Sequence, residues 1–307
     1  MPILKRVSER LQTVGYGLGL PSRESFVSET YLTNMLDSID RNPEIDRSST
    51  GHYMHVSELA RCKRKAVIDR LFNDGEPSYR TVSGYDRIVW RIGRAVEAHI
   101  RDGIIKGHGI SKIWGAWTCP CGAKRFDGFF PTNDPICPQC KKERNIYIEP
   151  DLIDNVNGVV GHPDLTLVMP DGSFLVIEIK SMTSNDWKAL EHAKGDHRFQ
   201  ACMYRSLYKS LGFNVHSKVI VIVATKDYSF KRSVSPYKEF HIDATLPELD
   251  RQLNESLKSA AMVKEFTKER KLPARSITCP NYDTPTAKNC SQCSLCFNLP
   301  EEEGSYV

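Results

Sequence analysis

The sequence predicts an α/β protein with a mixed central sheet flanked by helices. Segments with apolar residues at helical spacing and short strand-like segments both occur along the chain, and two of the strand-like segments are joined by a tight turn. The composition is that of a globular protein, with 40% hydrophobic and 26% charged residues in a chain of 307. No apolar run is long enough to span a membrane, and the charged N-terminus does not match a signal peptide. We therefore expect a cytoplasmic protein that has no membrane partner.

The N-terminal half is predicted to contain an arm followed by two helices. Residues 1–50 are interrupted by glycine and proline and are expected to form a loosely organised arm, which leaves 51–307 as the main domain. The first helix is predicted at 57–71, where Ser57 is a suitable N-cap, and the second at 85–105.

The C-terminal half is predicted to contain the sheet and two further helices. Strand-like segments are found at 159–168, 174–180 and 218–224. Helical spacing is found at 186–211 and 246–270, the latter with Pro247 in its first turn. A Cys-, Pro- and Gly-rich segment at 117–144 reads as an insertion before the sheet.

The turn between the first two strands fixes how they pair. A three-residue loop of sequence PDG makes Met169 pair with Ser173, so the residue numbers of every cross-strand pair have the same sum. Asp164 then lies opposite Glu178, and Lys180 shares the face of Glu178 because side chains alternate along a strand. Two carboxylates and one amine are thus predicted to converge.

These three side chains have the chemistry of a metal-dependent hydrolytic site. Two close carboxylates repel each other unless a cation lies between them, and their oxygen atoms suit Mg²⁺ or Mn²⁺. A lysine beside the metal can orient an attacking water and stabilise charge on a phosphate, which indicates phosphodiester hydrolysis. The alternative is an ordinary exposed hairpin with salt-bridged ends.

Three motifs follow one another around this hairpin: GHPD ending at Asp164, EIK from Glu178 to Lys180, and QACMY from Gln200 to Tyr204. In this order they resemble the RecB-like branch of the PD-(D/E)xK nucleases. The resemblance covers about residues 57–297 and implies a restriction-endonuclease-like core. It also implies that Gln200 and Tyr204, which are one helical turn apart, orient Lys180 or a DNA phosphate.

The segment GRAVEAH, residues 93–99, is similar to the first motif of that family, in which a glycine precedes a metal-binding residue on the same helix. Glu97 is favoured for this role and His99 is the alternative. The resemblance therefore implies a Mg²⁺ or Mn²⁺ site formed by Glu97, Asp164, Glu178 and Ile179.

Ten cysteines in a protein expected in a reducing compartment indicate metal ligands. Cys119 and Cys121 form one short knuckle, and Cys137 and Cys140 form another, as in zinc ribbons. We expect these four residues to bind Zn²⁺ within the inserted segment. The ribbon either stabilises the insertion or contacts DNA through its basic residues.

A second cysteine group combines one early residue with several near the C-terminus, in the segment 272–307. This arrangement resembles the iron–sulfur subgroup of the same family, which includes CRISPR-associated and AddB-type nucleases, and implies a [4Fe–4S] cluster that joins the chain ends. The implied ligands are Cys62, Cys279, Cys290 and Cys296. One alternative replaces Cys279 by Cys293, and another is a local zinc site of the four late cysteines.

The function implied by these motifs is metal-dependent DNA cleavage. Exonuclease action on DNA ends or single strands, in recombination, repair or replication, is expected from the resemblance. The alternatives are a non-catalytic DNA-binding protein on the same fold and a structure- or site-specific endonuclease. DNA is the expected partner, although the net charge of +4 alone would not identify it. The sequence does not indicate a protein partner or an oligomeric state.

Overall fold

The computed structural model describes residues 53–59, 62–72, 84–109, 112–119, 121, 126–129, 136–142, 146–226, 236–275, 279, 281, 283–284, 290 and 293–299. Contacts within the chain separate Met1–Pro43 from Glu44–Val307, and every described residue belongs to the second part. The arm expected at 1–50 therefore lies outside the described residues. No helix in the described ranges has both the length and the apolar character needed to cross a bilayer.

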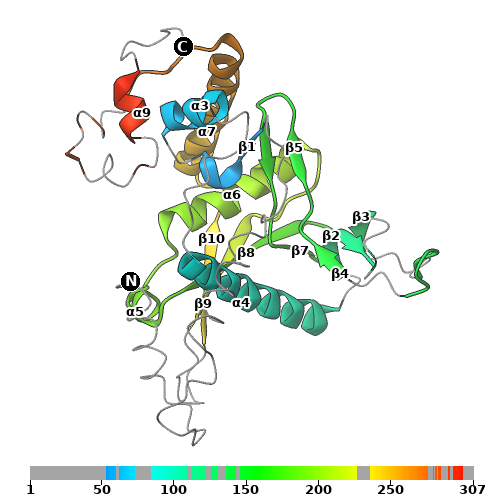
Figure 1. The fold of residues 1–307 in the computed structure, drawn as a ribbon. Coiled ribbons are helices and arrows are strands. Elements are labelled where there is room, and N and C mark those ends of the chain that lie inside the picture. The colour runs from blue at the N-terminus through cyan, green and yellow to red at the C-terminus, as the bar shows by residue number, and fades with distance from the viewer. Residues whose placement is uncertain are drawn as a thin grey trace, which may run out of the picture. The chain divides into compact units, whose positions relative to one another are not determined.

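Within the described residues, a mixed sheet of seven strands lies at the centre of Glu44–Val307 (Figure 1). Its order is β10 (Tyr237–Asp243), β9 (Lys218–Thr225), β8 (Phe174–Met182), β7 (Leu165–Val168), β2 (Ile113–Thr118) and β3 (Phe126–Phe129), with β4 (Ile146–Ile148) also paired to β2. β8 and β9 are parallel and the other neighbouring pairs are antiparallel. β9 is buried along almost its whole length, as expected for an apolar strand covered on both faces.

A second, small sheet contains β1 (Met54–His55), β6 (Val159–Gly161) and β5 (Leu152–Asp154). The prediction of one strand at 159–168 was therefore wrong, because its residues form β6 in this sheet and β7 in the large one. The break falls at 162–164, where Pro163 has no amide hydrogen to donate to a continuous strand ladder.

Two of the predicted helices are also divided in the structure. The first becomes a 3₁₀ turn, η2 (Val56–Glu58), and α3 (Lys63–Phe72). The Glu58 carboxylate accepts from the His55 amide at 3.0 Å and so caps the start of η2. The segment 186–211 becomes α5 (Ser184–Ala189) and α6 (Gly195–Ser210). The buried Trp187 indole donates to the Val223 carbonyl at 2.9 Å, which fixes α5 on the sheet before the chain turns into α6.

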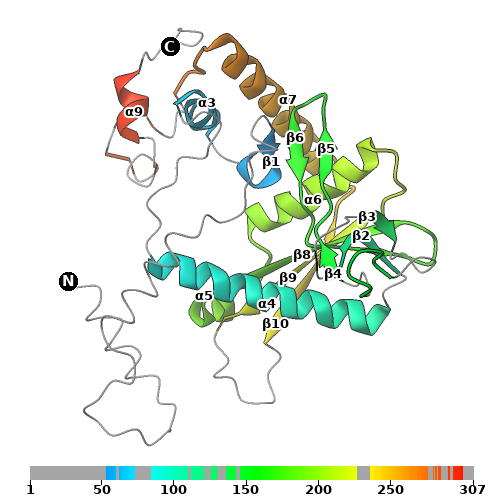
Figure 2. The same ribbon diagram turned by 45° about the vertical axis from the view of Figure 1, so that its right-hand side comes forward.

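The helices α4 (Gly84–His108) and α7 (Pro247–Glu269) agree with the predictions at 85–105 and 246–270. α6 and α4 both pack on β8 and cover opposite faces of the sheet (Figure 2). Alternate residues of β8 divide between two apolar clusters: Val176 joins the cluster under α6, whereas Ile177 and Ile179 join the one under α4. Two layers of helices thus hold the central strand from both sides.

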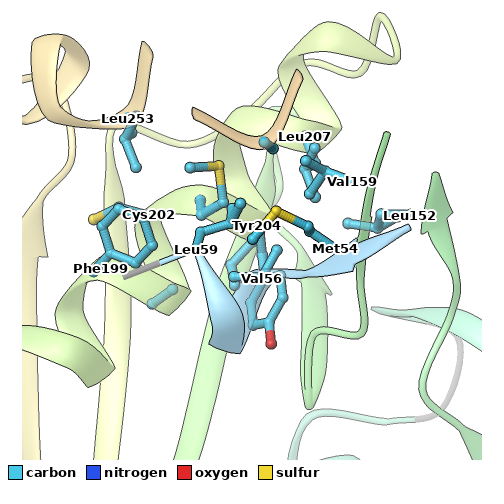
Figure 3. Packing of buried hydrophobic residues seen from close by; sticks show 14 of the residues in the cluster. Met54, Val56, Leu59, Leu152, Val159, Phe199, Cys202, Tyr204, Leu207 and Leu253 are labelled. Atoms are coloured by element: carbon cyan, nitrogen blue, oxygen red, sulfur yellow. The ribbon is translucent and has the colours of Figure 1, made fainter. Parts of the chain in front are cut away.

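The cluster under α6 also includes the small sheet and parts of the first and last described segments. Figure 3 shows Met54, Val56 and Leu59 packed among side chains of α6 such as Tyr204 and Leu207. The same cluster contains buried residues of α3 and α7, and α9 (Cys293–Asn298) packs against α3. The segments before and after the central sheet are therefore joined through one core.

Candidate active site and cysteine groups

The hairpin of β7 and β8 has the predicted register. The Met169 amide donates to the Ser173 carbonyl at 2.9 Å, and the pairs run from Val168 with Phe174 to Leu165 with Ile177. β7 begins at Leu165, whereas β8 continues beyond Ile177 with β9 as its partner. The edge of β8 is thus open where the predicted site residues lie.

Asp164 lies at this open edge, directly before β7. Its Oδ2 accepts a hydrogen bond of 2.6 Å from the Ile179 amide, which has no partner on β7. The carboxylate therefore takes the place of a missing strand neighbour, and this contact places it beside the end of β8 where Glu178 and Lys180 lie.

Glu178 and Lys180 form a close ion pair, with 2.5 Å between Lys180 Nζ and Glu178 Oε1. The Glu178 side chain is 1% exposed and that of Lys180 is 26% exposed. Beyond this ion pair, neither Glu178 oxygen has a hydrogen-bonding partner among the described residues. Burial, and then the charge of Asp164, raise the pKa of Glu178 well above its usual value, although Lys180 opposes the change.

Lys180 is held in its charged form. Burial favours the neutral amine, but the charges of Glu178 and Asp164 outweigh it and raise the pKa of Lys180 above its usual value. The site thus combines the positive charge of Lys180 with the carboxylate of Glu178, which burial makes costly to ionise. A divalent cation beside Glu178 would remove that cost.

Glu97, on α4, belongs to the same group. Ser181 Oγ donates to Glu97 Oε1 at 3.1 Å, and burial together with the Asp164 charge raises the pKa of Glu97. A Cβ at Gly93, one turn earlier, would lie 2.9 Å from Ser181 Oγ, so a glycine lets α4 approach β8 this closely. His99 is exposed on the same helix. The structure brings Glu97 to the cluster, and its role as a metal ligand stays a prediction.

A fourth carboxylate, Glu149, lies directly after β4 and was not predicted. It pairs with Arg101 of α4, whose Nη1 is 3.0 Å from Glu149 Oε1 and whose guanidinium carbon is 5.3 Å from the centre of the Tyr147 ring. Burial and the charge of Asp164 raise the pKa of Glu149 to about 7, against the effect of Arg101. Arg101 follows Glu97 by four residues, so helical spacing along α4 could have predicted that Arg101 lies on the same side of the helix as Glu97. No local signal identifies Glu149.

The two predicted residues of α6 lie in different surroundings. Tyr204 is buried in the cluster under α6, where a Cβ at Gly161 would come within 2.8 Å of its ring (Figure 3). Gln200 is half-buried one turn earlier. Their proposed action on Lys180 stays a prediction. His197, which was not predicted, is half-buried on α6, where burial lowers its pKa and the Lys180 charge adds to this effect against that of Asp196.

The first cysteine group can hold a metal ion. The sulfur atoms of Cys119, Cys121, Cys137 and Cys140 all lie within 4.8 Å of one another. Cys119 follows β2, and the second knuckle is closed by a turn in which Lys141 has a left-handed φ of 58° and donates from its amide to the Cys137 carbonyl at 2.9 Å. The amide of Cys140 lowers the pKa of the Cys137 thiol, which favours the thiolate form that binds metals.

The second group is assembled from both ends of the described chain. Cys62 precedes α3, and its charge raises the pKa of Cys296 on α9, after the larger effect of burial and against that of Arg64. Burial and the charges of Cys290 and Cys279 raise the pKa of Cys293. Cys62 is thus related to Cys296, and Cys279 and Cys290 are related to Cys293, which lies three residues before Cys296 on α9. No three of their described sulfur atoms are as close together as those of the first group.

Arg64 links the described segments that precede and follow the central sheet. Its side chain is fully buried, and its Nη1 donates to the Pro273 carbonyl at 2.6 Å. Together with the packing of α3 on α9, this bond brings the early cysteine to the late ones. The early and late cysteines thus lie in the same part of the protein, and the metal centre expected from them stays a prediction.

No family model and no curated protein matches the sequence. Two solved structures are similar to the chain at low identity. The protein SSO0001 is 15% identical with a TM-score of 0.38, over 90% of this chain and 97% of that one. An alkaline exonuclease (LHK-Exo) from Laribacter hongkongensis is 12% identical with a TM-score of 0.35, over 72% of this chain and 94% of that one.

The raised pKa values predict how pH and divalent cations affect stability. A carboxyl with a raised pKa binds its proton more tightly in the folded state than in the unfolded state. The bound proton therefore stabilises the fold fully below the usual pKa of 4.5. This stabilisation is lost as pH rises through the folded pKa, which is about 7 for Glu149. A cation that replaces these protons should therefore stabilise the protein more at about pH 8 than at about pH 5.

Thermal unfolding at the two pH values, with and without Mg²⁺, measures this difference. Other titrating groups cancel in the comparison, because only the effect of the added cation is scored. Glu178→Gln should abolish most of the pH dependence of the Mg²⁺ effect. An equal Mg²⁺ shift at both pH values would show that these carboxyls do not form the cation site.

Proposed function

We propose that the protein is a metal-dependent DNA nuclease with a PD-(D/E)xK core. The observation that carries the proposal is the meeting of Glu97, Asp164 and Glu178 beside a charged lysine, at the open edge of one buried strand. The raised pKa values of Glu97 and Glu178 reflect burial and the nearby charge of Asp164, and a divalent cation can neutralise this excess of negative charge. Such a group suits phosphodiester hydrolysis better than a purely structural role.

Each residue has a part in this proposal. Oxygen atoms of Glu97, Asp164 and Glu178 and the Ile179 carbonyl would hold Mg²⁺ or Mn²⁺. The bound cation supplies positive charge that activates water and stabilises the phosphate during displacement. Lys180 is the more exposed member of its ion pair, so its ammonium can donate to an attacking water or to a phosphate oxygen.

The preferred substrate is proposed to be DNA with an end or a single strand, as the resemblance to RecB-like nucleases implies. The proposal includes exonuclease action in recombination, repair or replication. An assay with Mg²⁺ or Mn²⁺ can compare end-labelled linear DNA with circular single-stranded DNA. Cleavage of the linear substrate alone supports an exonuclease, cleavage of the circle indicates an endonuclease, and binding without cleavage indicates a non-catalytic protein.

Substitutions in the cluster should abolish cleavage while the fold remains. Lys180→Ala and Asp164→Ala remove the water-orienting amine and one metal ligand, and each change should cost at least ~2.7 kcal/mol of barrier, or about 100-fold in rate. His99→Ala is the matched control for Glu97→Ala, because both residues lie on α4 but only Glu97 reaches the cluster. Initial rates on labelled DNA measure the effect.

Retention of about one third or more of the parental rate in both Lys180→Ala and Asp164→Ala would rule out the proposed site. A loss of activity in His99→Ala equal to that in Glu97→Ala would contradict the choice of Glu97. Circular dichroism of each variant checks that the protein is folded.

We further propose two thiolate-bound centres. Zn²⁺ is assigned to Cys119, Cys121, Cys137 and Cys140, whose spacing and closeness suit tetrahedral ligation. A [4Fe–4S] cluster is assigned to Cys62, Cys279, Cys290 and Cys296. The proximity of Cys62 to Cys296 supports a centre that crosses between the chain ends, and Cys293 is the alternative ligand to Cys279.

One pair of variants separates the two centres. Cys62→Ser should lose iron and the broad absorption near about 400 nm but keep zinc, whereas Cys140→Ser should lose zinc and keep iron. Cys62→Ser should also unfold at a lower temperature, because the centre joins distant parts of the chain. Metal analysis of anaerobically purified protein is the measurement. Full iron content in Cys62→Ser would instead indicate a local site made of the late cysteines.

A further inference from the structure

One large aromatic side chain on α4 is exposed without any role in the core. Trp90 is 50% exposed, whereas Trp117 and Trp187 are buried and Trp114 is half-buried. These are all the tryptophans of the chain. An indole ring left half in solvent offers a flat apolar surface that a ligand can cover.

The position of Trp90 on the helix relates it to the candidate active site. Trp90 precedes Glu97 by seven residues, which is close to two helical turns, so the two side chains leave nearly the same flank of α4 about 10 Å apart along its axis. Arg101, one further turn along, continues the row. Ile92, which is 45% exposed, leaves a different side of the helix.

Contacts of Glu97 with β8 and of Arg101 with the residue after β4 show that this flank faces the site. Glu97 accepts from Ser181 at 3.1 Å, and Arg101 pairs with Glu149, whose pKa responds to Asp164. Trp90 thus lies at the outer end of a row whose inner members reach the carboxylates. A ligand bound at the carboxylates and extending along α4 toward its N-terminus would reach the indole.

The charges beside the indole suit a polyanion. Arg91 and Arg94 are exposed on the same helix. Lys226 donates from Nζ to the carbonyl of Val89, the residue before Trp90, at 3.4 Å. Its charge also lowers the pKa of Glu97 against the effect of burial. The Lys226 ammonium is therefore close to both the helix turn that carries Trp90 and the carboxylates. Positive groups next to an aromatic ring are the combination that binds the phosphates and bases of single strands.

We propose that Trp90 is a base-stacking site that holds single-stranded DNA as it enters the carboxylate cluster, with Arg94 and Lys226 beside the phosphates. The inference rests on the proposed nuclease function and names the form of its substrate. We expect a single strand because bases inside a duplex are stacked on both faces and present no free face to the indole.

The tryptophan content of the chain makes the site directly measurable. In the Glu178→Gln background, which slows cleavage, addition of an unlabelled single-stranded oligonucleotide should quench the fluorescence of the exposed indole. Trp90→Phe should remove the quenching but keep affinity within about threefold, because a phenyl ring still stacks. Trp90→Ala should weaken binding by about tenfold or more in an anisotropy titration, and Ile92→Ala should leave it unchanged.

Any of these outcomes would overturn the proposal: affinity within about twofold of the parent in Trp90→Ala, equal quenching by blunt duplex DNA, or a changed oligomeric state in Trp90→Ala with DNA binding intact. The last would assign the indole to a protein interface. Binding and cleavage are scored separately. If DNA quenches the fluorescence but the parental protein does not cleave DNA, the stacking site is supported and the nuclease proposal is refuted. If the protein cleaves DNA but shows no quenching, the nuclease proposal is supported and the stacking site is refuted.

Discussion

A buried carboxylate is costly to ionise unless a positive charge lies beside it, and this constraint on Glu178 organises the rest of the structure. Glu178 lies on a strand covered by α4 on one face and α6 on the other. It is ion-paired with Lys180 and lies near a second carboxylate, Asp164, which is fixed by the Ile179 amide. A fold selected for stability alone would place an apolar residue there, and this excess of acid is the reason for the cation in the proposed function.

The open edge of β8 is the second condition. Because β7 is short, the Ile179 amide has no partner on β7 and can donate to Asp164. The strand breaks at Pro163, so the residues before it pair in the small sheet instead. From the other side of the sheet, α4 approaches closely enough at Gly93 for Glu97 to reach Ser181. The cluster is therefore formed by two segments far apart in sequence that meet at the end of one strand.

Local rules predicted the parts of this arrangement that depend on nearby residues. The turn after Met169 fixed the hairpin register, and the period of apolar residues identified α4 and α7. The division of 186–211 depends on a contact between Trp187 and a strand that follows it, which periodicity does not register. The position of Glu149 depends on the pairing of β4 with β2, two strands separated by the cysteine-rich insertion. Non-local pairing is the kind of information that spacing in the sequence lacks.

The two cysteine groups support the site from different directions. The first lies beyond the ends of β2 and β4, so a metal there would hold the strand that leads to Glu149. The second, together with the buried Arg64, joins α3 to the C-terminal segment. Metals bound at both groups would limit movement of segments around the central sheet, and this would suit the proposed active site, whose carboxylates need fixed distances.

The central claim is that the carboxylates at the end of β8 bind a divalent cation. Anomalous diffraction at the manganese edge, from crystals grown with Mn²⁺, tests it most directly. We expect a peak within coordination distance of Asp164, Glu178 and the Ile179 carbonyl, with Glu97 on its other side. An absence of manganese at this position, with the metal bound elsewhere or not at all, would contradict the account.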